Sequence, residues 1–303
     1  MNLNKFLSLF GVLLVIGCHK GNDSFKKFEN ASIPMVLGQG SLSTDSIQWN
    51  NVFVQNTKEL YFTKMDRSAS VIYKMTYEDH TFEDLQAVDF PKDSPHSDVY
   101  VNPAGDLMLF SSLMKEHEND TVSDWNIWRS VRINAQWQKP ELFFETNMEG
   151  NQFYPWLTDS GNLYFAITPH GSGNSDLYVS DYENEKHTTP KALPSHINSS
   201  KLEGDAFVAA DESYLIFAGF ERVQNLGKSD LYISFNNEGS WTTPVWLGEK
   251  INSNGYDGSP FVTHDGKYLI FTSSRGSTDE NTFFNHYIVR FNPQLYKGIP
   301  EAV

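Results

Sequence analysis

The side chains of this chain that could carry chemistry are acidic and amide residues placed at one point of a repeated unit. The sequence from Asp257 to Phe271 is repeated without a gap from Glu203 to Phe217. Looser copies of the same pattern end at Phe165, Phe110 and Phe62. A unit that returns after about 50 residues is typical of β-propellers and solenoids. Equivalent side chains of successive units are therefore expected to lie together in space.

Polar residues lie near the start of the first strand expected in each unit, and arginines follow the second. Polar groups that converge on a concave opening are the usual hypothesis for a ligand site. An architectural role is the alternative, because Asp and Asn at strand starts also bond the backbone of their own turns. The predicted ligand-binding residues are Asn50, Asp98, Asn151, Asp205, Asp257, Arg222 and Arg275.

Two carboxylates at such an opening could act as the acid and the base of a glycoside hydrolase. The candidates for this chemistry are Asp98, Glu203, Asp205 and Asp257. Any acidic propeller would contain such residues, so no catalytic residue is assigned and the chain is expected to be a binding protein rather than an enzyme. The segment Gly171–Ser175 has the wrong order for the Gly-x-Ser-x-Gly motif of serine hydrolases.

No metal site or cofactor is predicted. The chain has a single cysteine, and its histidines do not form an HExxH motif, so a zinc site is not expected. Carboxylates would suit Ca²⁺, but the sequence contains no contiguous calcium-binding loop. Asp176 and Asp230, at the start of two strands, are expected to cap the loops before them.

The charge of the chain limits its partners. The formal net charge is -15, with a pI of about 4.9. Nucleic-acid binding requires clustered Lys and Arg, and adsorption to anionic lipid requires a basic surface. Neither a nucleic acid nor an anionic membrane surface is therefore an expected partner of the folded domain. The expected partner is therefore an envelope protein or a glycan.

Short strands separated by turn residues fill each unit, without helical periodicity. In the unit that begins near Asp205, four strands are expected at 205–209, 214–218, 230–234 and 241–247. The fourth contains Pro244, which cannot donate to a strand ladder and favours an edge position. Each unit is therefore predicted to be a four-stranded sheet with its fourth strand outermost.

The last unit has no fourth strand of its own, and the N-terminus offers a replacement. Ile33–Gly38 resembles Pro244–Gly248, so an N-terminal strand is predicted to complete the last sheet and close the ring. The expected fold is all-β, a β-propeller of about five four-stranded blades in one domain over residues 31–303. Six blades, a solenoid and two β-sandwiches are the alternatives.

Several of these motifs resemble a known family. Ser259-Pro260-Phe261, Asp265-Gly266-Lys267, Leu269–Ser273 and Arg275 look like the PD40 (WD40-like) repeats of TolB-type propellers. The segment from Ser229 to Ser253 is similar to PD40 repeats of outer-membrane proteins of the Bacteroidetes type. The resemblance implies a β-propeller used for binding in the cell envelope. It implies no particular reaction, because propellers host unrelated functions.

The N-terminus is predicted to be a lipoprotein signal peptide over residues 1–17. Lys5 precedes an apolar run at 6–16 that is too short to span a bilayer. Val15-Ile16-Gly17-Cys18 then looks like a bacterial lipobox, which implies lipidation of Cys18. Polar residues up to 30 are expected to form a flexible tether. The expected location is the outer membrane, facing either the periplasm or the cell surface, with the lipid at Cys18 as the membrane attachment.

Overall fold

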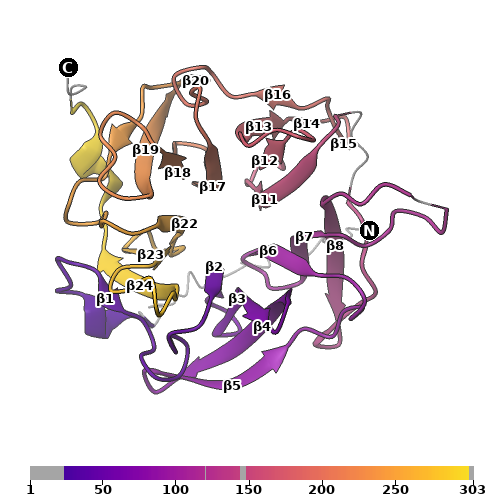
Figure 1. Ribbon diagram of the computed structural model, residues 1–303, viewed down its shortest axis with the longest axis horizontal. Coiled ribbons are helices and arrows are strands. Elements are labelled where there is room, and N and C mark those ends of the chain that lie inside the picture. The colour runs from indigo at the N-terminus through magenta and orange to yellow at the C-terminus, as the bar shows by residue number, and fades with distance from the viewer. Residues whose placement is uncertain (1–23, 120, 144–147, 300–303) are drawn as a thin grey trace, which may run out of the picture.

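The computed structural model describes residues 24–119, 121–143 and 148–299. These residues form five antiparallel sheets arranged radially around a central axis, which confirms the predicted all-β, five-bladed propeller (Figure 1). The alternatives of six blades, a solenoid or two sandwiches are wrong. Outside the sheets lie two short 3₁₀ helices, η1 (Lys26–Phe28) and η2 (Pro293–Tyr296).

Each blade is numbered from the axis outward. The first blade contains β2 (Gln48–Val54), β3 (Glu59–Asp66), β4 (Ala69–Glu78) and β5 (Thr81–Ala87). The second contains β6 (His96–Val101), β7 (Leu107–Ser112), β8 (Asn126–Ile133), β9 (Gln136–Trp137) and β10 (Glu141–Leu142). The third contains β11 (Asn151–Leu157), β12 (Leu163–Thr168), β13 (Asp176–Ser180) and β16 (Lys191–Ala192), with a small hairpin of β14 (Tyr182–Glu183) and β15 (Lys186–His187).

The fourth and fifth blades follow the same order. The fourth contains β17 (Glu203–Val208), β18 (Tyr214–Phe220), β19 (Ser229–Asn237), β20 (Ser240–Trp241) and β21 (Val245–Trp246). The fifth contains β22 (Asp257–Val262), β23 (Tyr268–Ser273) and β24 (Asn285–Arg290), and its outermost strand is β1 (Met35–Val36). The strands β2, β6, β11, β17 and β22 are thus innermost, as Figure 1 shows.

The predicted ring closure by the N-terminal strand is confirmed. Met35 pairs with Ile288 and Val36 with Tyr287, in antiparallel register. The next backbone amide, of Leu37, donates to the carbonyl of His286 at 2.8 Å. The fifth blade therefore combines strands from the two ends of the propeller sequence, and β1 covers the outer edge of β24.

Proline divides the outermost strand of the fourth blade into two pieces, as its missing N–H requires. Pro244 lies between β20 and β21. Ser234 on the neighbouring strand donates to the carbonyl of Thr242 at 2.6 Å and holds this irregular edge in place. The second and third blades repeat the arrangement, with Ser130 and Ser180 donating to the edge segment.

The core lies between the blades, where the second strand of each is covered on both faces. This burial explains why these strands are continuous apolar runs. In β18, Leu215, Ile216 and Phe217 are fully buried, as are Leu269, Ile270 and Phe271 in β23.

The folded domain begins earlier than residue 31. Phe25 and Phe28 fall within the segment expected to be a tether, yet both are buried. The Phe25 ring packs edge-on against Phe53, with 4.8 Å between ring centroids. Residues 24–30 therefore correct the predicted boundary, because two aromatic rings in a polar segment are enough to dock it. The predicted signal peptide over 1–17 and the lipidation site at Cys18 lie outside the described residues. Among the residues that are described, no helix has the length and apolar character needed to cross a membrane.

Truncation of Leu37 should loosen the ring closure. Leu37 is fully buried directly after β1, so Leu37→Ala is expected to lower the free energy of unfolding by about 2–5 kcal/mol. Met35→Ala is the control, because the Met35 side chain is 48% exposed. Urea denaturation of the purified protein measures both. Equal stability of the two variants would contradict the importance of this strand.

Candidate functional site

The innermost strand of every blade has one β-bulge residue with a left-handed backbone. At each of these positions φ lies between 48° and 54°, and the ladder register shifts beside it. Bulges re-aim side chains and bend the strand. The five bulge residues, in chain order, are Asn50, Asp98, Tyr154, Asp205 and Ser259.

The sequence-predicted residues fall on different positions of this pattern. Asn50, Asp98 and Asp205 share the bulge position. Glu203 and Asp257 lie two residues before a bulge, and Asn151 is the first residue of β11. The structure therefore divides the predicted set into a group at the bulges and a group at the strand starts.

Asp205 lies at the centre of a hydrogen-bond network with the third and fifth blades. Its Oδ2 accepts bonds from the Tyr256 hydroxyl at 2.5 Å, the Ser259 amide at 2.8 Å and the Ser259 hydroxyl at 3.0 Å. The Tyr154 hydroxyl also bonds to this carboxyl group. A Cβ on Gly258 would collide with the Tyr256 hydroxyl, so the network requires glycine there. Asp205 is 5% exposed and links the third, fourth and fifth blades.

Asp98 occupies the same position in the second blade. Its Oδ1 accepts from the Ser97 hydroxyl at 2.8 Å and from the Trp49 indole at 3.2 Å. Burial, followed by the charge of Asp205, raises the pKa of Asp98 to about 7. Burial also raises the pKa of Asp205, although four hydrogen bonds oppose that shift. The two carboxyl groups are thus electrostatically coupled in a buried region of the ring.

An aromatic slot opens beside Asp98, on the end of the ring that carries the loops between second and third strands. We call this end the loop face. The slot has a volume of about 340 Å³. Its walls include Trp49, Trp125, Phe153 and Tyr154. The backbone amide of Trp125 donates to Oδ1 of Asn151 at 3.0 Å, so the predicted ligand residue Asn151 positions one wall.

The other predicted charges form two equivalent ion pairs at the strand starts. Arg222 Nη1 lies 2.7 Å from Glu203 Oε1, and Arg275 Nη2 lies 2.8 Å from Asp257 Oδ1. Both carboxylate side chains are fully buried.

Each of these arginines also fastens the loop that enters its blade. Arg222 donates to the carbonyls of His196 and Ile197, and Arg275 donates to that of Ile251. The Arg222 guanidinium lies 5.2 Å from the centre of the Tyr232 ring. The two arginines and their carboxylate partners thus bond to one another and to the backbone of the loop that enters their own blade.

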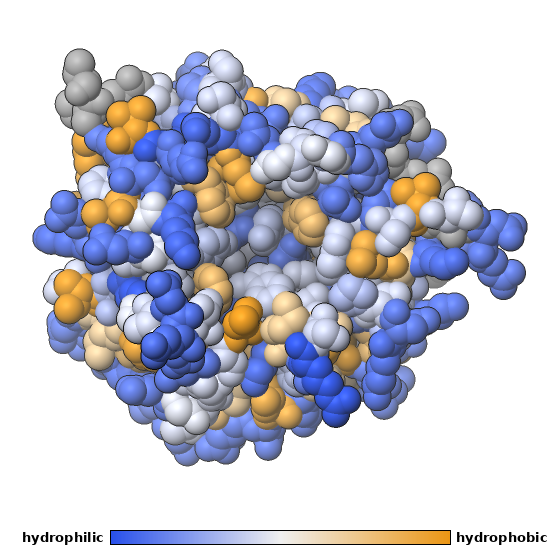
Figure 2. All heavy atoms as spheres, viewed as in Figure 1, coloured by the Kyte–Doolittle hydropathy of each residue, from blue (hydrophilic) through white to orange (hydrophobic). Residues whose placement is uncertain are grey.

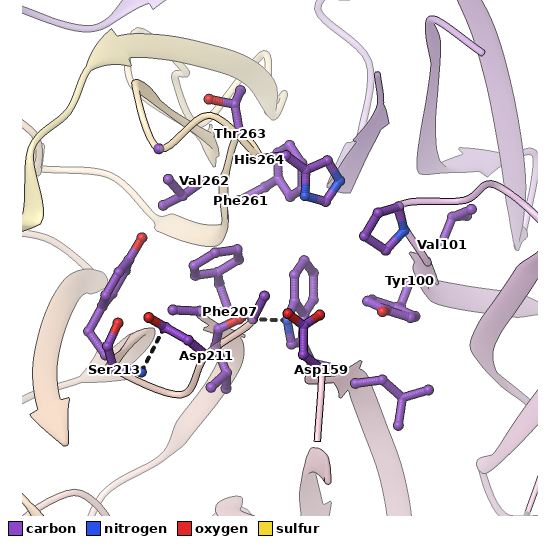
Figure 3. Close-up of a pocket in the computed structure, with 18 residues that line it drawn as sticks. Tyr100, Val101, Asp159, Phe207, Asp211, Ser213, Phe261, Val262, Thr263 and His264 are labelled. Atoms are coloured by element: carbon purple, nitrogen blue, oxygen red, sulfur yellow. Dashed lines mark hydrogen bonds between the residues drawn. The ribbon is translucent and has the colours of Figure 1, made fainter. Parts of the chain in front are cut away.

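The opposite end of the ring, where the first and second strands of each blade are joined by tight turns, has a second cavity. We call this end the turn face. The cavity has a volume of about 290 Å³. Figure 3 shows residues from four blades around it, among them Tyr100, Asp159, Phe207 and His264. Figure 2 shows one face of the molecule, with a hollow at the centre of the ring.

The turn-face residues were not among the sequence-predicted site residues. A signal for them exists in the repeat itself. Pro103, Asp159, Ala210 and His264 occupy the same place in successive turns, two residues after the innermost strand, and all four line the cavity. The residue type at this turn position differs from blade to blade, so the fold does not require a particular side chain there. This variation within the repeat could have identified the position as a candidate site from the sequence.

The capping role predicted for Asp230 is confirmed. Its carboxylate accepts the amides of Leu226 and Gly227 and the indole of Trp246. Among the described residues, no group of three or more His, Cys, Asp or Glu side chains is arranged to hold a metal ion.

Comparison with solved structures places the fold. The TolB protein of Agrobacterium tumefaciens aligns with a TM-score of 0.50 and 12% identity, over 82% of this chain and 92% of that one. A protein described as a glycoside hydrolase aligns at 0.56 and 10%, over 92% and 97%. An α-L-arabinofuranosidase of Lactobacillus brevis aligns at 0.54 and 14%, over 89% and 95%.

No protein-family model matches the sequence, and the comparison with curated proteins found no match. At 10–14% identity, the likeness to these structures shows a TolB-like β-propeller and leaves the function open, because the same architecture occurs in binding proteins and in glycosidases.

The buried Asp98 should make stability depend on pH. Since its pKa is raised from 3.8 to about 7, the native state holds a proton that the unfolded chain releases between these values. The free energy of unfolding should therefore fall as pH rises through this window, by up to about 1.4 kcal/mol for each pH unit. Asp98→Asn should reduce that slope. Denaturation midpoints at several pH values test this, and parallel curves for variant and wild type would refute it.

Removing one arginine should show that the strand-start ion pairs are structural. Arg222→Met leaves the Glu203 carboxylate buried without its cation, which should lower the free energy of unfolding by about 3–5 kcal/mol. Lys201→Met breaks an exposed pair with Glu221 nearby and should leave the denaturation midpoint close to that of the wild type. An Arg222→Met protein as stable as Lys201→Met would contradict this assignment.

Proposed function

We propose that this protein is a non-catalytic binding module of the cell envelope whose partner is a protein or a glycan. In this proposal it is a lipoprotein of the PD40, Bacteroidetes type, attached to the outer membrane by a lipid on Cys18. The lipobox-like Val15–Cys18 supports the attachment, and the PD40-like motifs of the last two repeats support the envelope role. The domain faces the periplasm or the cell surface.

One observation carries the proposal: the candidate carboxylates at the loop face are enclosed by hydrogen bonds and ion pairs of the fold itself. Asp98 and Asp205 are 2% and 5% exposed and accept hydrogen bonds from the fold itself. Glu203 and Asp257 are paired with arginines. A glycosidase needs an acid and a base that both reach the substrate. These four carboxylates are committed to the fold, which favours binding over catalysis.

A carbohydrate-active enzyme is the second candidate, and Asp98 favours it. A carboxyl group with a pKa of about 7 beside an aromatic slot has the proton affinity of a general acid. Its partner would be Asp205, whose carboxylate is enclosed by Tyr256 and Ser259. Opening of that network would be required before a substrate could reach both groups.

Capture from detergent-solubilised envelopes tests the binding function. Ala210 is exposed and lines the turn-face cavity, so Ala210→Trp should fill the cavity and abolish capture of the partner by the immobilised protein. Ala104→Trp, in the corresponding turn of the second blade but outside the cavity lining, is the control and should capture normally. Equal capture by both variants would place binding elsewhere.

A glycan panel separates the two candidates. The wild-type protein is expected to cleave none of the glycans. Cleavage that is lost in Asp98→Asn, with the fold retained, would overturn the non-catalytic function in favour of the enzyme.

A further inference from the structure

The turn-face cavity has a floor of aromatic rings that the repeat itself produces. The next-to-last residue of each innermost strand is aromatic in all five blades, and four of these rings line the cavity: Tyr100, Trp156, Phe207 and Phe261. Trp156 lies 5.0 Å from Tyr100 and 4.9 Å from Phe207, between ring centroids, in edge-to-face geometry. The Trp156 indole also donates to the carbonyl of Val208 at 2.8 Å. The floor is therefore fixed by ring contacts and by a hydrogen bond to the backbone.

Carboxylates stand at the rim of this floor. Asp159 extends from the turn of the third blade and Asp211 from that of the fourth (Figure 3). Hydrogen bonds from Ser213 lower the pKa of Asp211, so its carboxylate is charged at neutral pH. Within the described chain the Asp159 carboxylate has no hydrogen-bond or ion-pair partner, although its amide is bonded to the carbonyl of Ala210.

Positive charge is missing from the lining. No Lys or Arg is among the residues that surround the cavity. Desolvation lowers the pKa of His264, the one titratable base of the lining, so its imidazole is neutral at neutral pH. The formal net charge of -15 adds a long-range attraction for cations. Carboxylates without a cationic partner, above an apolar floor, favour a ligand that carries a positive charge.

We propose that the turn-face cavity binds a single Lys or Arg side chain of a protein partner. This inference rests on the proposed binding function and narrows the partner to a protein with an exposed basic residue. The alkyl stem of the side chain would lie against the rings, and its charged end would reach Asp159 and Asp211. The volume of about 290 Å³ is at the lower limit of ordinary small-molecule pockets, and a single side chain suits it.

A glycan fits this cavity less well. Sugars stack on the flat faces of exposed aromatic rings, whereas these rings pack edge to face and are at most 8% exposed. The rim also offers carboxylates that accept hydrogen bonds, while the nearby indole N–H is already bonded to Val208. A group with a positive charge and several hydrogen-bond donors can bond to the rim carboxylates and needs no donor from the cavity.

Synthetic peptides test this ligand class. The probes are nine-residue peptides of otherwise identical sequence whose central residue is Arg, citrulline, Lys or norleucine. The peptides with Arg and Lys are expected to bind at least about tenfold more tightly than their neutral counterparts, measured by isothermal titration at low ionic strength.

Charge-matched variants isolate the local contribution. Asp159→Asn/Asp211→Asn should reduce the preference for Arg over citrulline to about twofold. Glu78→Gln/Asp79→Asn removes the same number of charges from the exposed β4–β5 turn and should leave the preference unchanged. An equal loss in both double variants would overturn the proposal, because it would show a general charge effect.

The result also separates this inference from the proposed function. If Ala210→Trp abolishes partner capture while citrulline binds as tightly as Arg, the cavity binds a partner but the cationic ligand is wrong. If Ala210→Trp captures normally and no peptide binds, both the cavity and the ligand class are wrong. Tight binding of Arg and Lys peptides that Ala210→Trp removes is the outcome that supports the inference.

Discussion

The structure depends on how the innermost strands find hydrogen-bond partners for the backbone groups on their inner edge, which no further strand covers. Each of these strands pairs with a neighbour on its outer side and presents free N–H and C=O groups toward the axis, a situation that costs free energy if the groups are buried. Side chains of the adjacent blade solve the problem. Asp205 accepts the Ser259 amide, Thr63 accepts the Asp98 amide, and Asn51 and Trp156 donate to the carbonyls of Ser259 and Val208. Ring closure and the arrangement of the polar groups at the axis are therefore one constraint.

This constraint explains why carboxylates near the axis look like a catalytic pair in the sequence and are enclosed in the structure. A bulge residue can send its side chain toward a neighbouring blade, and a short acidic side chain can accept a backbone N–H there. Asp205 does so, at the cost of desolvation that raises its pKa. Glu203 and Asp257 serve the loops instead, through Arg222 and Arg275. An acidic residue in an inner strand is thus first a structural acceptor, and its availability for a ligand depends on what else it bonds.

The sequence was sufficient for the fold because the fold repeats. The five aromatic-ended apolar runs, Pro244 at an outer edge and the likeness of Ile33–Gly38 to Pro244–Gly248 predicted the blades and their closure. Burial of Phe25 was missed because a polar segment contains no periodicity that would reveal two anchoring rings. The site was predicted less well. Asn50 and Asp205 share a bulge position, but Glu203 lies two residues away, and that shift depends on a backbone irregularity that no residue type specifies.

The two ends of the ring differ in how many of their side chains the repeat determines. At the loop face, recurring Glu or Asp, Arg and Asn side chains bond to the backbone in equivalent ways, as the Asn198 and Asn252 side chains do when they cap Leu177 and Leu231. At the turn face, the aromatic floor recurs, whereas the residue above it is Pro103, Asp159, Ala210 or His264. The repeat supplies a platform of similar aromatic rings. Selectivity for a ligand can therefore arise at the turn position above the rings, where the residue type differs between blades. Among the described residues that line the cavity, no Lys or Arg balances the charge of the Asp159 carboxylate. The asymmetry that distinguishes one blade from the next is therefore also what the proposed basic ligand would recognise.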